Sequence, residues 1–273
     1  MVEKNNFKFK AYCGEEVPLG KLCGFLKENY LTILYTREYL EWFFSGESSL
    51  CVKEDDKGNF VAVAMASVFP LFFLNKEYPI LHAGPICVKK DLRKKTLILP
   101  FLSEVENYKD KTYSHPSFAN ALSRFKTNPS ATQKILFHNF GIFAVDKNSL
   151  KEPKEKIFCQ FNMHLKKSEG YIFDFYENKE GWVAVHYQDV KHEGVCEKLG
   201  VVISYSTKGS WNSLIYESTK EKFLNYCDKV VVFENYERKS SSLEGMGFKR
   251  MLNYSLFHDT IDKKYLYYNF FLY

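Results

Sequence analysis

The feature that most constrains the fold of this sequence is an order of elements that occurs twice. Residues 49–88 contain two apolar segments around a polar turn and then a third apolar segment, and residues 171–206 repeat this order. The second apolar segment begins with Phe-Val-Ala-Val at residue 60 and with Trp-Val-Ala-Val at residue 182, each with a lysine three residues earlier. A helical pattern follows the third segment in both copies. The sequence therefore predicts duplication of one α/β unit.

Helices are expected where apolar residues recur at helical spacing. One candidate covers residues 17–31, and a second covers residues 36–44 with Thr36 as its N-cap. A third runs from about Leu97 to Tyr108, with Pro100 tolerated in its first turn. The polar turn of the first copy, Asp55 to Asn59, predicts a hairpin.

The remaining elements follow the same reasoning in both copies. The expected strands and helices are a strand at 81–88, a strand at 199–206, a helix at 213–228, a strand ending at Asn235, a helix containing Leu243, and a strand opened by Gly247 and Phe248. The stretch between the copies, 109–156, carries Pro116, Pro129 and Pro153 among many polar residues. We expect an α/β protein of two fused halves, residues 1–130 and 131–273, each a mixed sheet flanked by helices.

Composition narrows the class of protein. The net charge is only +5 and the basic residues are spread along the chain, so a nucleic-acid-binding face is not required. Aromatic residues make up 17% of the chain, which predicts a core of packed rings or, alternatively, a deep apolar tunnel. The most apolar stretch, residues 60–74, is broken by Ser67 and Pro70 and is shorter than the ~20 residues that span a bilayer. We expect no transmembrane segment and no signal peptide.

The cysteines indicate a reducing compartment. None is spaced as a metal knuckle or redox pair, and an odd number does not suit a disulfide framework. They stand at positions 13, 23, 51, 87, 159, 196 and 227. We expect reduced thiols and a cytoplasmic location, with no bound metal.

Residues 82–96, HAGPICVKKDLRKKT, run from an apolar segment directly into a cluster of cations. The cations are Lys89, Lys90, Arg93, Lys94 and Lys95. Backbone N–H groups at a helix start, assisted by cations, bind phosphate groups well. The run is therefore either an anion site or a solvated helix entry.

The segment KVVVFENYERKSSSLEGMGFKR resembles the closing part of the GCN5-related N-acyltransferases, in which a splayed parallel strand pair admits an acyl-CoA. The alternative is that this segment is an ordinary strand, helix and glycine-terminated turn, a pattern that many unrelated proteins contain. The chain as a whole resembles the glycylpeptide N-tetradecanoyltransferases, or N-myristoyltransferases. The matching segments, in the same order over nearly the whole chain, are FLKENYL with REYLEWFF, GPICVKKDLRKK, TNPSATQKILFHNF, VVVFENYERKSSSLEGMGF and KKYLYYNFF.

This resemblance implies two fused acyltransferase-like halves that transfer a myristoyl group from myristoyl-CoA to an amino-terminal glycine. It places the catalytic backbone donors at Pro85, Ile86 and Cys87, although Pro85 has no N–H. It implies that the Tyr273 carboxylate helps to deprotonate the glycine amine. The implied acyl-CoA contacts are Ile86, Cys87, Val88, Arg93, Lys94, Lys95, Thr96 and Leu97, in the first half.

The resemblance also implies that the second half holds the acceptor peptide. The implied peptide contacts are Tyr205, Asp259, Asp262 and Tyr267. Myristoyl-CoA acts as a co-substrate, no other cofactor is expected, and the protein is expected to be a monomer. Four histidines, His115, His138, His186 and His258, are alternative bases or simply packed or solvated side chains. Two further functions stay open: a non-catalytic relative that binds acyl-CoA or an acylated partner, and an N-acetyltransferase of small amines.

Overall fold

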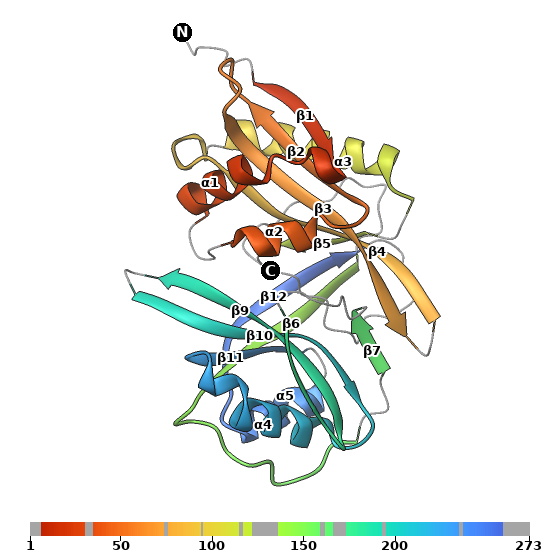
Figure 1. Ribbon diagram of the computed structural model, residues 1–273, viewed down its shortest axis with the longest axis vertical. Helices are drawn as coiled ribbons and strands as arrows, with labels where there is room; N and C mark the ends of the chain where they lie inside the picture. Colours follow the sequence, from red (N-terminus) through yellow and green to blue (C-terminus); the bar gives the residue numbers. More distant parts are fainter. Residues whose placement is uncertain are drawn as a thin grey trace. The chain divides into compact units, whose positions relative to one another are not determined.

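The structure is a computed structural model that describes residues 7–30, 35–73, 76–93, 95–114, 117–121, 136–158, 162–165, 173–192, 195–234 and 237–258. It divides into two compact units (Figure 1). The first unit comprises residues 1–69 and 80–117, and the second comprises residues 70–79 and 118–273. The predicted boundary at residue 130 lies outside the described residues and stays a prediction.

The first unit is a sheet with helices on both faces. Its strands lie in the order β1-β2-β3-β4, with β1 antiparallel to β2 and β2 antiparallel to β3. Its elements are β1 (Lys8–Cys13), α1 (Leu19–Asn29), α2 (Arg37–Phe43), β2 (Ser48–Glu54), β3 (Phe60–Phe73) up to residue 69, β4 (Lys76–Val88) from residue 80, and α3 (Lys95–Thr112). Helices α1 and α2 cover one face of the sheet and α3 covers the other (Figure 1). Burial of both faces explains why the first half of β3, residues 60–66, reads as a continuous apolar run rather than an alternating one.

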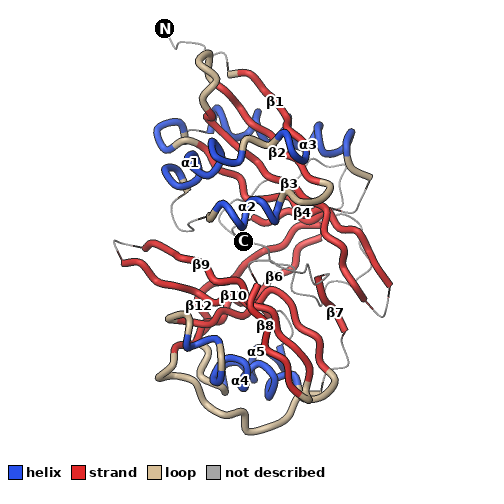
Figure 2. Tube along the Cα trace, viewed as in Figure 1, coloured by secondary structure: helices blue, strands red, loops and turns tan. Residues whose placement is uncertain are grey.

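The second unit is a mixed sheet with strand order β5-β12-β6-β11-β10-β9-β8, and β7 pairs with β10 off this path. Between its described strands the pairings are antiparallel, except that β10 pairs with β11 in parallel. Its elements are β5 (Ser117–Ala121), β6 (Leu136–Asp146), β7 (Asn162–Leu165), β8 (Phe173–Asn178), β9 (Gly181–His192), β10 (Val195–Thr207), α4 (Trp211–Glu221), β11 (Lys229–Glu234), α5 (Glu237–Gly245) and β12 (Lys249–His258). Figure 2 shows α4 and α5 beside the strands of this unit.

The predicted repeat is confirmed. The order β2-β3-β4-α3 in the first unit matches β8-β9-β10-α4 in the second, and the two Val-Ala-Val segments open the equivalent strands β3 and β9. The expected fold class, α/β with two helix-flanked halves, is likewise confirmed. Thr36 is the N-cap of α2 as predicted, since its hydroxyl oxygen accepts a hydrogen bond of 3.2 Å from the backbone N–H of Tyr39.

Two predicted helix boundaries differ from the structure. Helix α3 begins at Lys95 rather than Leu97, so Pro100 lies in its second turn. Helix α4 begins earlier than expected, because the Ser210 hydroxyl oxygen accepts a hydrogen bond from the N–H of Ser213, and it ends at Glu221. A short 3-10 helix at Phe223–Asn225 replaces its predicted last turns.

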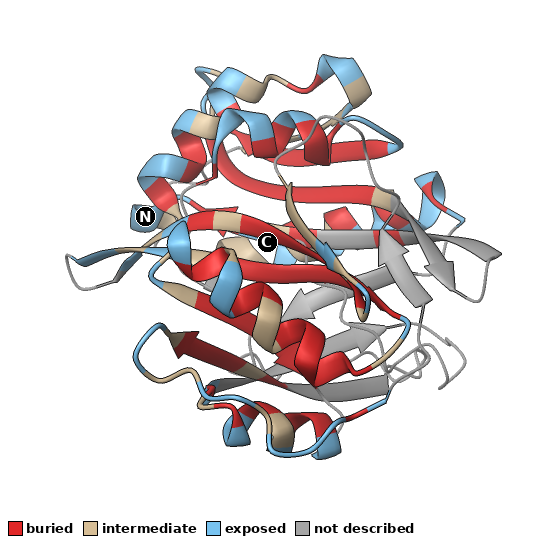
Figure 3. Cartoon of the chain, turned by 60° about the horizontal axis from the view of Figure 1, so that its bottom comes forward, coloured by how far each residue is buried: buried red, intermediate tan, exposed pale blue. Residues whose placement is uncertain are grey.

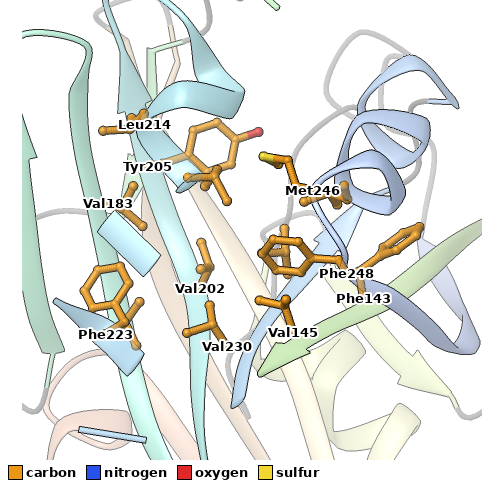
Figure 4. Packing of buried hydrophobic residues seen from close by; sticks show 14 of the residues in the cluster. Phe143, Val145, Val183, Val202, Tyr205, Leu214, Phe223, Val230, Met246 and Phe248 are labelled. Carbon is orange, nitrogen blue, oxygen red and sulfur yellow. The ribbon is translucent and has the colours of Figure 1, made fainter. Parts of the chain in front are cut away.

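Each unit has its own core. In the second unit, side chains of β6, β9, β10 and β11 meet those of α4 and the α5–β12 turn, with Trp211, Phe143 and Phe223 fully buried (Figure 4). In the first unit, aromatic rings pack in a chain whose centroids lie 5.2 Å apart for Tyr30 and Tyr35 and 5.4 Å apart for Tyr35 and Tyr39. These contacts favour the packed-ring explanation of the aromatic content.

The helices are buried on the side that faces a sheet and exposed on the opposite side (Figure 3). None of the described helices combines the length and the apolar character that crossing a bilayer requires. The six described cysteines are free thiols, and within the described ranges no group of three or more His, Cys, Asp or Glu side chains is arranged to hold a metal ion.

Candidate functional site

The predicted donor segment lies at the carboxyl end of β4. Cys87 and Val88 are buried, whereas Ile86 is 42% exposed. The N–H of Lys89 donates a hydrogen bond of 2.8 Å to the carbonyl of Val61, which ties the chain leaving this strand to β3. Pro85 lies within the strand and contributes no N–H. The structure thus presents Ile86 at the surface of a strand end that is otherwise packed.

Arg93 fixes the basic turn to the end of α1. Its Nε donates a hydrogen bond of 3.0 Å to the carbonyl of Val88, and its guanidinium also donates to the carbonyl of Asn29. The buried Asn29 side chain accepts a hydrogen bond of 3.1 Å from the N–H of Lys90. Arg93 therefore has a structural role besides the phosphate contact that the sequence predicts. The sequence did not indicate that Asn29 accepts hydrogen bonds from this turn, although the Glu-Asn-Tyr segment that contains it is one of the segments that resemble the family.

The described cations of this turn have exposed side chains. Lys89, Lys90 and Arg93 are exposed, and the turn itself is a short 3-10 helix, Lys90–Leu92. Helix α3 follows at Lys95, so these charges precede the positive end of a long helix. The other implied acyl-CoA contacts are less fully described: Lys94 lies outside the described residues, as do the side chains of Lys95 and Thr96, and Leu97 packs against the core under α3.

The thiol beside this strand end is not a nucleophile at neutral pH. Burial raises the pKa of Cys87 from 9.0 to about 11, and the nearby Arg93 opposes this rise only in part. Burial also raises the pKa of Tyr35 and Tyr39 well above the ordinary value of 10.0. The proximity of Cys87 contributes to the rise at Tyr30 and Tyr35. The strand end is therefore backed by an apolar, uncharged wall of aromatic side chains, which sequence reasoning did not identify.

We expect Cys87 to resist alkylation. Only the thiolate reacts, and a pKa of about 11 in place of 9.0 lowers the thiolate fraction at pH 8 about 100-fold. Brief treatment with iodoacetamide at pH 8, followed by peptide mass mapping, should modify the exposed Cys13 and Cys196 well before Cys87. Modification of Cys87 at the rate of Cys13 would show that the strand end is open to solvent and that its thiol is reactive.

The equivalent turn of the second unit, between β10 and α4, is closed by the chain itself. The N–H groups of Lys208 and Gly209 donate to the carbonyl of Glu180 at 2.7 and 3.2 Å. The N–H of Ser210 donates to Oε2 of Glu180 at 2.7 Å. A Cβ atom at Gly209 would lie 2.0 Å from this same oxygen. A carboxylate of the protein thus occupies the place at the start of α4 where a bound anion would sit.

Strands β10 and β11 pair in parallel over only a few residues. Leu199 to Val201 pair with Lys229 to Val231, and farther along Tyr205 and Ser206 pair with β7 instead. A β-bulge follows Val202, where the register with β9 shifts between Val202 and Ser204. The two strands therefore separate beyond Val201, towards the carboxyl end of each strand.

Tyr205 is the one implied peptide contact that the structure describes. It is buried, and its hydroxyl oxygen accepts a hydrogen bond of 2.9 Å from Nζ of Lys239. The other implied residues of the acceptor site, Asp259, Asp262, Tyr267 and Tyr273, lie outside the described residues.

The histidines considered as bases differ in how far they are described. His186 is buried, and its ring lies 6.0 Å from that of Phe173, centroid to centroid. His115 lies outside the described residues, as do the side chains of His138 and His258. His186 is therefore a packed core side chain, which was the alternative to a catalytic base.

Comparison with known proteins identifies the architecture. No family model matches the chain, and no curated protein sequence matches it. Among solved structures, N-myristoyltransferase of Saccharomyces cerevisiae with bound myristoyl-CoA is similar over 92% of this chain and 82% of its own, at 11% identity and a TM-score of 0.65. A second structure of that yeast enzyme with bound myristoyl-CoA gives a TM-score of 0.63 at 11% identity, over 95% and 79%.

A probable N-acyltransferase from Enterococcus faecalis is similar over 92% of this chain and 72% of its own, at 10% identity and a TM-score of 0.52. The matches extend over both units and agree with the duplicated order of elements. This chain has the fold of the N-myristoyltransferases, a fold it shares with the GCN5-related N-acetyltransferases.

Proposed function

We propose that this protein is an acyltransferase that moves a myristoyl group from myristoyl-CoA to the amino-terminal glycine of acceptor proteins. The first unit binds the acyl-CoA and the second holds the acceptor. Its six described cysteines are free thiols, which supports a cytoplasmic location.

The observation that carries this proposal is the difference between the two equivalent turns. Acyl-CoA brings a diphosphate and a ribose phosphate, and it needs a turn with cations and available donors. After β4 the turn offers the exposed side chains of Lys89, Lys90 and Arg93. After β10, Glu180 already occupies the N–H groups of the turn. The fold therefore favours one acyl-CoA per chain, bound in the first unit.

The chemistry requires no covalent intermediate on the protein. The acceptor amine attacks the thioester carbonyl, the C–N bond forms, the C–S bond breaks, and CoA leaves as its thiol. Because the Cys87 thiol stays protonated, direct transfer is favoured over a thioester to this residue. Hydrogen bonds from the backbone N–H groups of Ile86 and Cys87 would stabilise the negative charge that develops on the carbonyl oxygen. Asp259 and Asp262, each acting through water, are our candidates for the base that accepts the amine proton.

A non-catalytic acyl-CoA-binding protein is the second candidate, and Pro85 favours it. A proline at the predicted first donor position removes one hydrogen bond to the oxyanion. Removing one such donor typically lowers kcat about 100-fold to 1000-fold. We therefore expect slow transfer rather than none.

The test is transfer from myristoyl-CoA to matched octapeptides that begin with glycine or alanine. A site that selects glycine by excluding side chains should acylate the glycine peptide and leave the alanine peptide largely unmodified. Equal rates with both peptides would contradict the proposed acceptor. No transfer, with stabilisation of the protein by myristoyl-CoA in a thermal melt, would establish the non-catalytic candidate instead.

A further inference from the structure

Helix α3 carries a run of apolar residues near its start. Residues 97–102, Leu-Ile-Leu-Pro-Phe-Leu, are all apolar. An α-helix completes a turn every ~3.6 residues, so a run of this length extends around the whole helix and not along one face only. Phe101 is fully buried, whereas Leu99 is 58% exposed. Part of the run therefore lies on the outward side of α3.

The remainder of α3 has the usual division between a buried and an exposed side. Val105 is buried against the core of the first unit. The exposed positions beyond the apolar run carry polar side chains, among them Ser103, Glu106 and Asp110. The exposed apolar residues of α3 are therefore confined to its amino-terminal part.

The outward part of the run is a continuous patch. Leu97 and Ile98 pack against the core beneath α3. Leu99 and Pro100 are exposed, and Leu102, one turn after Leu99, is partly exposed. Residues three apart on a helix are neighbours on its surface, so Leu99, Pro100 and Leu102 adjoin one another. A single exposed apolar residue is ordinary, but this group, which we call the α3 apolar patch, is an unusual start for an exposed helix.

The basic turn lies at the same end of α3. Residues 89–95 contain five cations and one acidic residue, and the described cations Lys89, Lys90 and Arg93 have exposed side chains. The positive end of the helix dipole adds to this charge. The exposed acidic residues Glu106 and Asp110 lie in the second half of the helix. Positive charge and exposed apolar surface therefore occur together at the amino-terminal end of α3.

This combination matches the chemistry of an anionic lipid surface. Phosphate and carboxylate headgroups attract lysine and arginine, and the boundary between headgroups and acyl chains accepts exposed leucine side chains. A polyanion in solution would use the cations alone and leave Leu99 in water. The net charge of the chain, +5, also favours approach to a negatively charged surface.

We propose that the basic turn and the α3 apolar patch together dock the protein on an anionic lipid surface, with α3 approaching by its amino-terminal end. This inference goes beyond the proposed function and is tested without acyl transfer. Long-chain acyl-CoA partitions into lipid because of its acyl chain, so docking would bring the first unit to the place where this donor accumulates.

The experiment measures co-sedimentation with vesicles of phosphatidylcholine, prepared with and without phosphatidylserine. The wild-type protein is compared with Leu99→Ser, which alters the patch, and Lys90→Gln, which alters the turn. Val195→Ser is the matched apolar control, because Val195 of β10 is 61% exposed in the second unit. Lys111→Gln is the matched charge control, because Lys111 is an exposed lysine in the last turn of α3. Thermal melts confirm that each variant folds.

We expect the wild-type protein to bind vesicles that contain phosphatidylserine, to bind pure phosphatidylcholine far more weakly, and to dissociate at high salt. Leu99→Ser should weaken binding about tenfold, because the leucine side chain no longer enters the lipid. Lys90→Gln should weaken it about fivefold, the effect of one cation near an anionic surface. Both control variants should bind within about twofold of the wild-type protein.

Three results would overturn the proposal. A wild-type protein that does not distinguish the two kinds of vesicle has no anionic lipid site. Full vesicle binding by Leu99→Ser would assign the basic turn to polyanions in general, an acidic protein included. A loss of affinity for myristoyl-CoA in Leu99→Ser, titrated without vesicles, would place the patch in the donor site instead. Failure of acyl transfer would leave vesicle binding unchanged, so the two proposals fail separately.

Discussion

Replacing Arg93 with alanine is expected to weaken the binding of myristoyl-CoA about 100-fold, which corresponds to about 2.7 kcal/mol. The substitution removes a cation from the turn after β4, and it also removes the hydrogen bonds to the carbonyls of Val88 and Asn29. The turn then loses part of its attachment to α1 and keeps the hydrogen bond from the N–H of Lys90 to the Asn29 side chain. Calorimetric titration of the purified variant at low salt measures the effect, with a thermal melt to confirm folding.

Two further substitutions separate charge from geometry. Arg37→Ala removes the same charge from an exposed arginine of α2 that pairs with Glu41 at 2.8 Å, and it should change affinity by less than about twofold. Arg93→Lys keeps the charge at the turn but lacks the forked guanidinium, so we expect an intermediate loss of about tenfold. Equal affinity of the Arg37→Ala and Arg93→Ala variants would show that the basic run is only a solvated face.

Replacing Gly247 with alanine is expected to lower the free energy of unfolding by about 3 kcal/mol or more. Gly247 has a φ of +90°, and a Cβ atom there would lie 1.9 Å from the carbonyl oxygen of Ser149. Both atoms of this clash belong to or adjoin the backbone, so no side chain can move to relieve it. The turn also carries the hydrogen bond of 2.9 Å from the N–H of Lys151 to the carbonyl of Met246, which the substitution would strain.

A matched control lies two residues away. Gly245 ends α5, and a Cβ atom there would have no neighbour within 4 Å. Because alanine is favoured over glycine in helices, Gly245→Ala should be neutral or stabilising by up to about 1 kcal/mol. Urea unfolding of both variants gives the comparison. A Gly247→Ala midpoint equal to that of the wild-type protein would mean that the α5–β12 turn is not packed as described.

Local patterns were sufficient to predict the elements and their duplicated order. The helical spacing of apolar residues, the turn at Asp55 to Asn59 and the Thr36 cap all depend on neighbours in the sequence. Helix boundaries were less predictable, since α4 depends on how Ser210 bonds to Ser213 and on where the chain turns into the 3-10 helix. The bulge in β10 left no clear signal, because Val202 and Ser204 fit a regular strand equally well.

The site residues that the sequence missed are joined by long-range contacts. Asn29 meets Lys90 across 61 residues, Glu180 meets Ser210 across 30, and Lys239 meets Tyr205 across 34. No periodicity in one sequence encodes such pairs. The basic run after β4 was visible because its charges are consecutive, whereas the fixed position of Arg93 became visible only in the structure.

The central claim, long-chain transfer to an amino-terminal glycine, is tested most directly by competition between two acyl donors. The protein is incubated with a glycine octapeptide and an equimolar mixture of myristoyl-CoA and acetyl-CoA, and the products are identified by mass spectrometry. We predict that the peptide gains a single myristoyl group at its amino terminus and no acetyl group. A predominantly acetylated peptide would contradict the account and assign the protein to the N-acetyltransferases of small acyl groups.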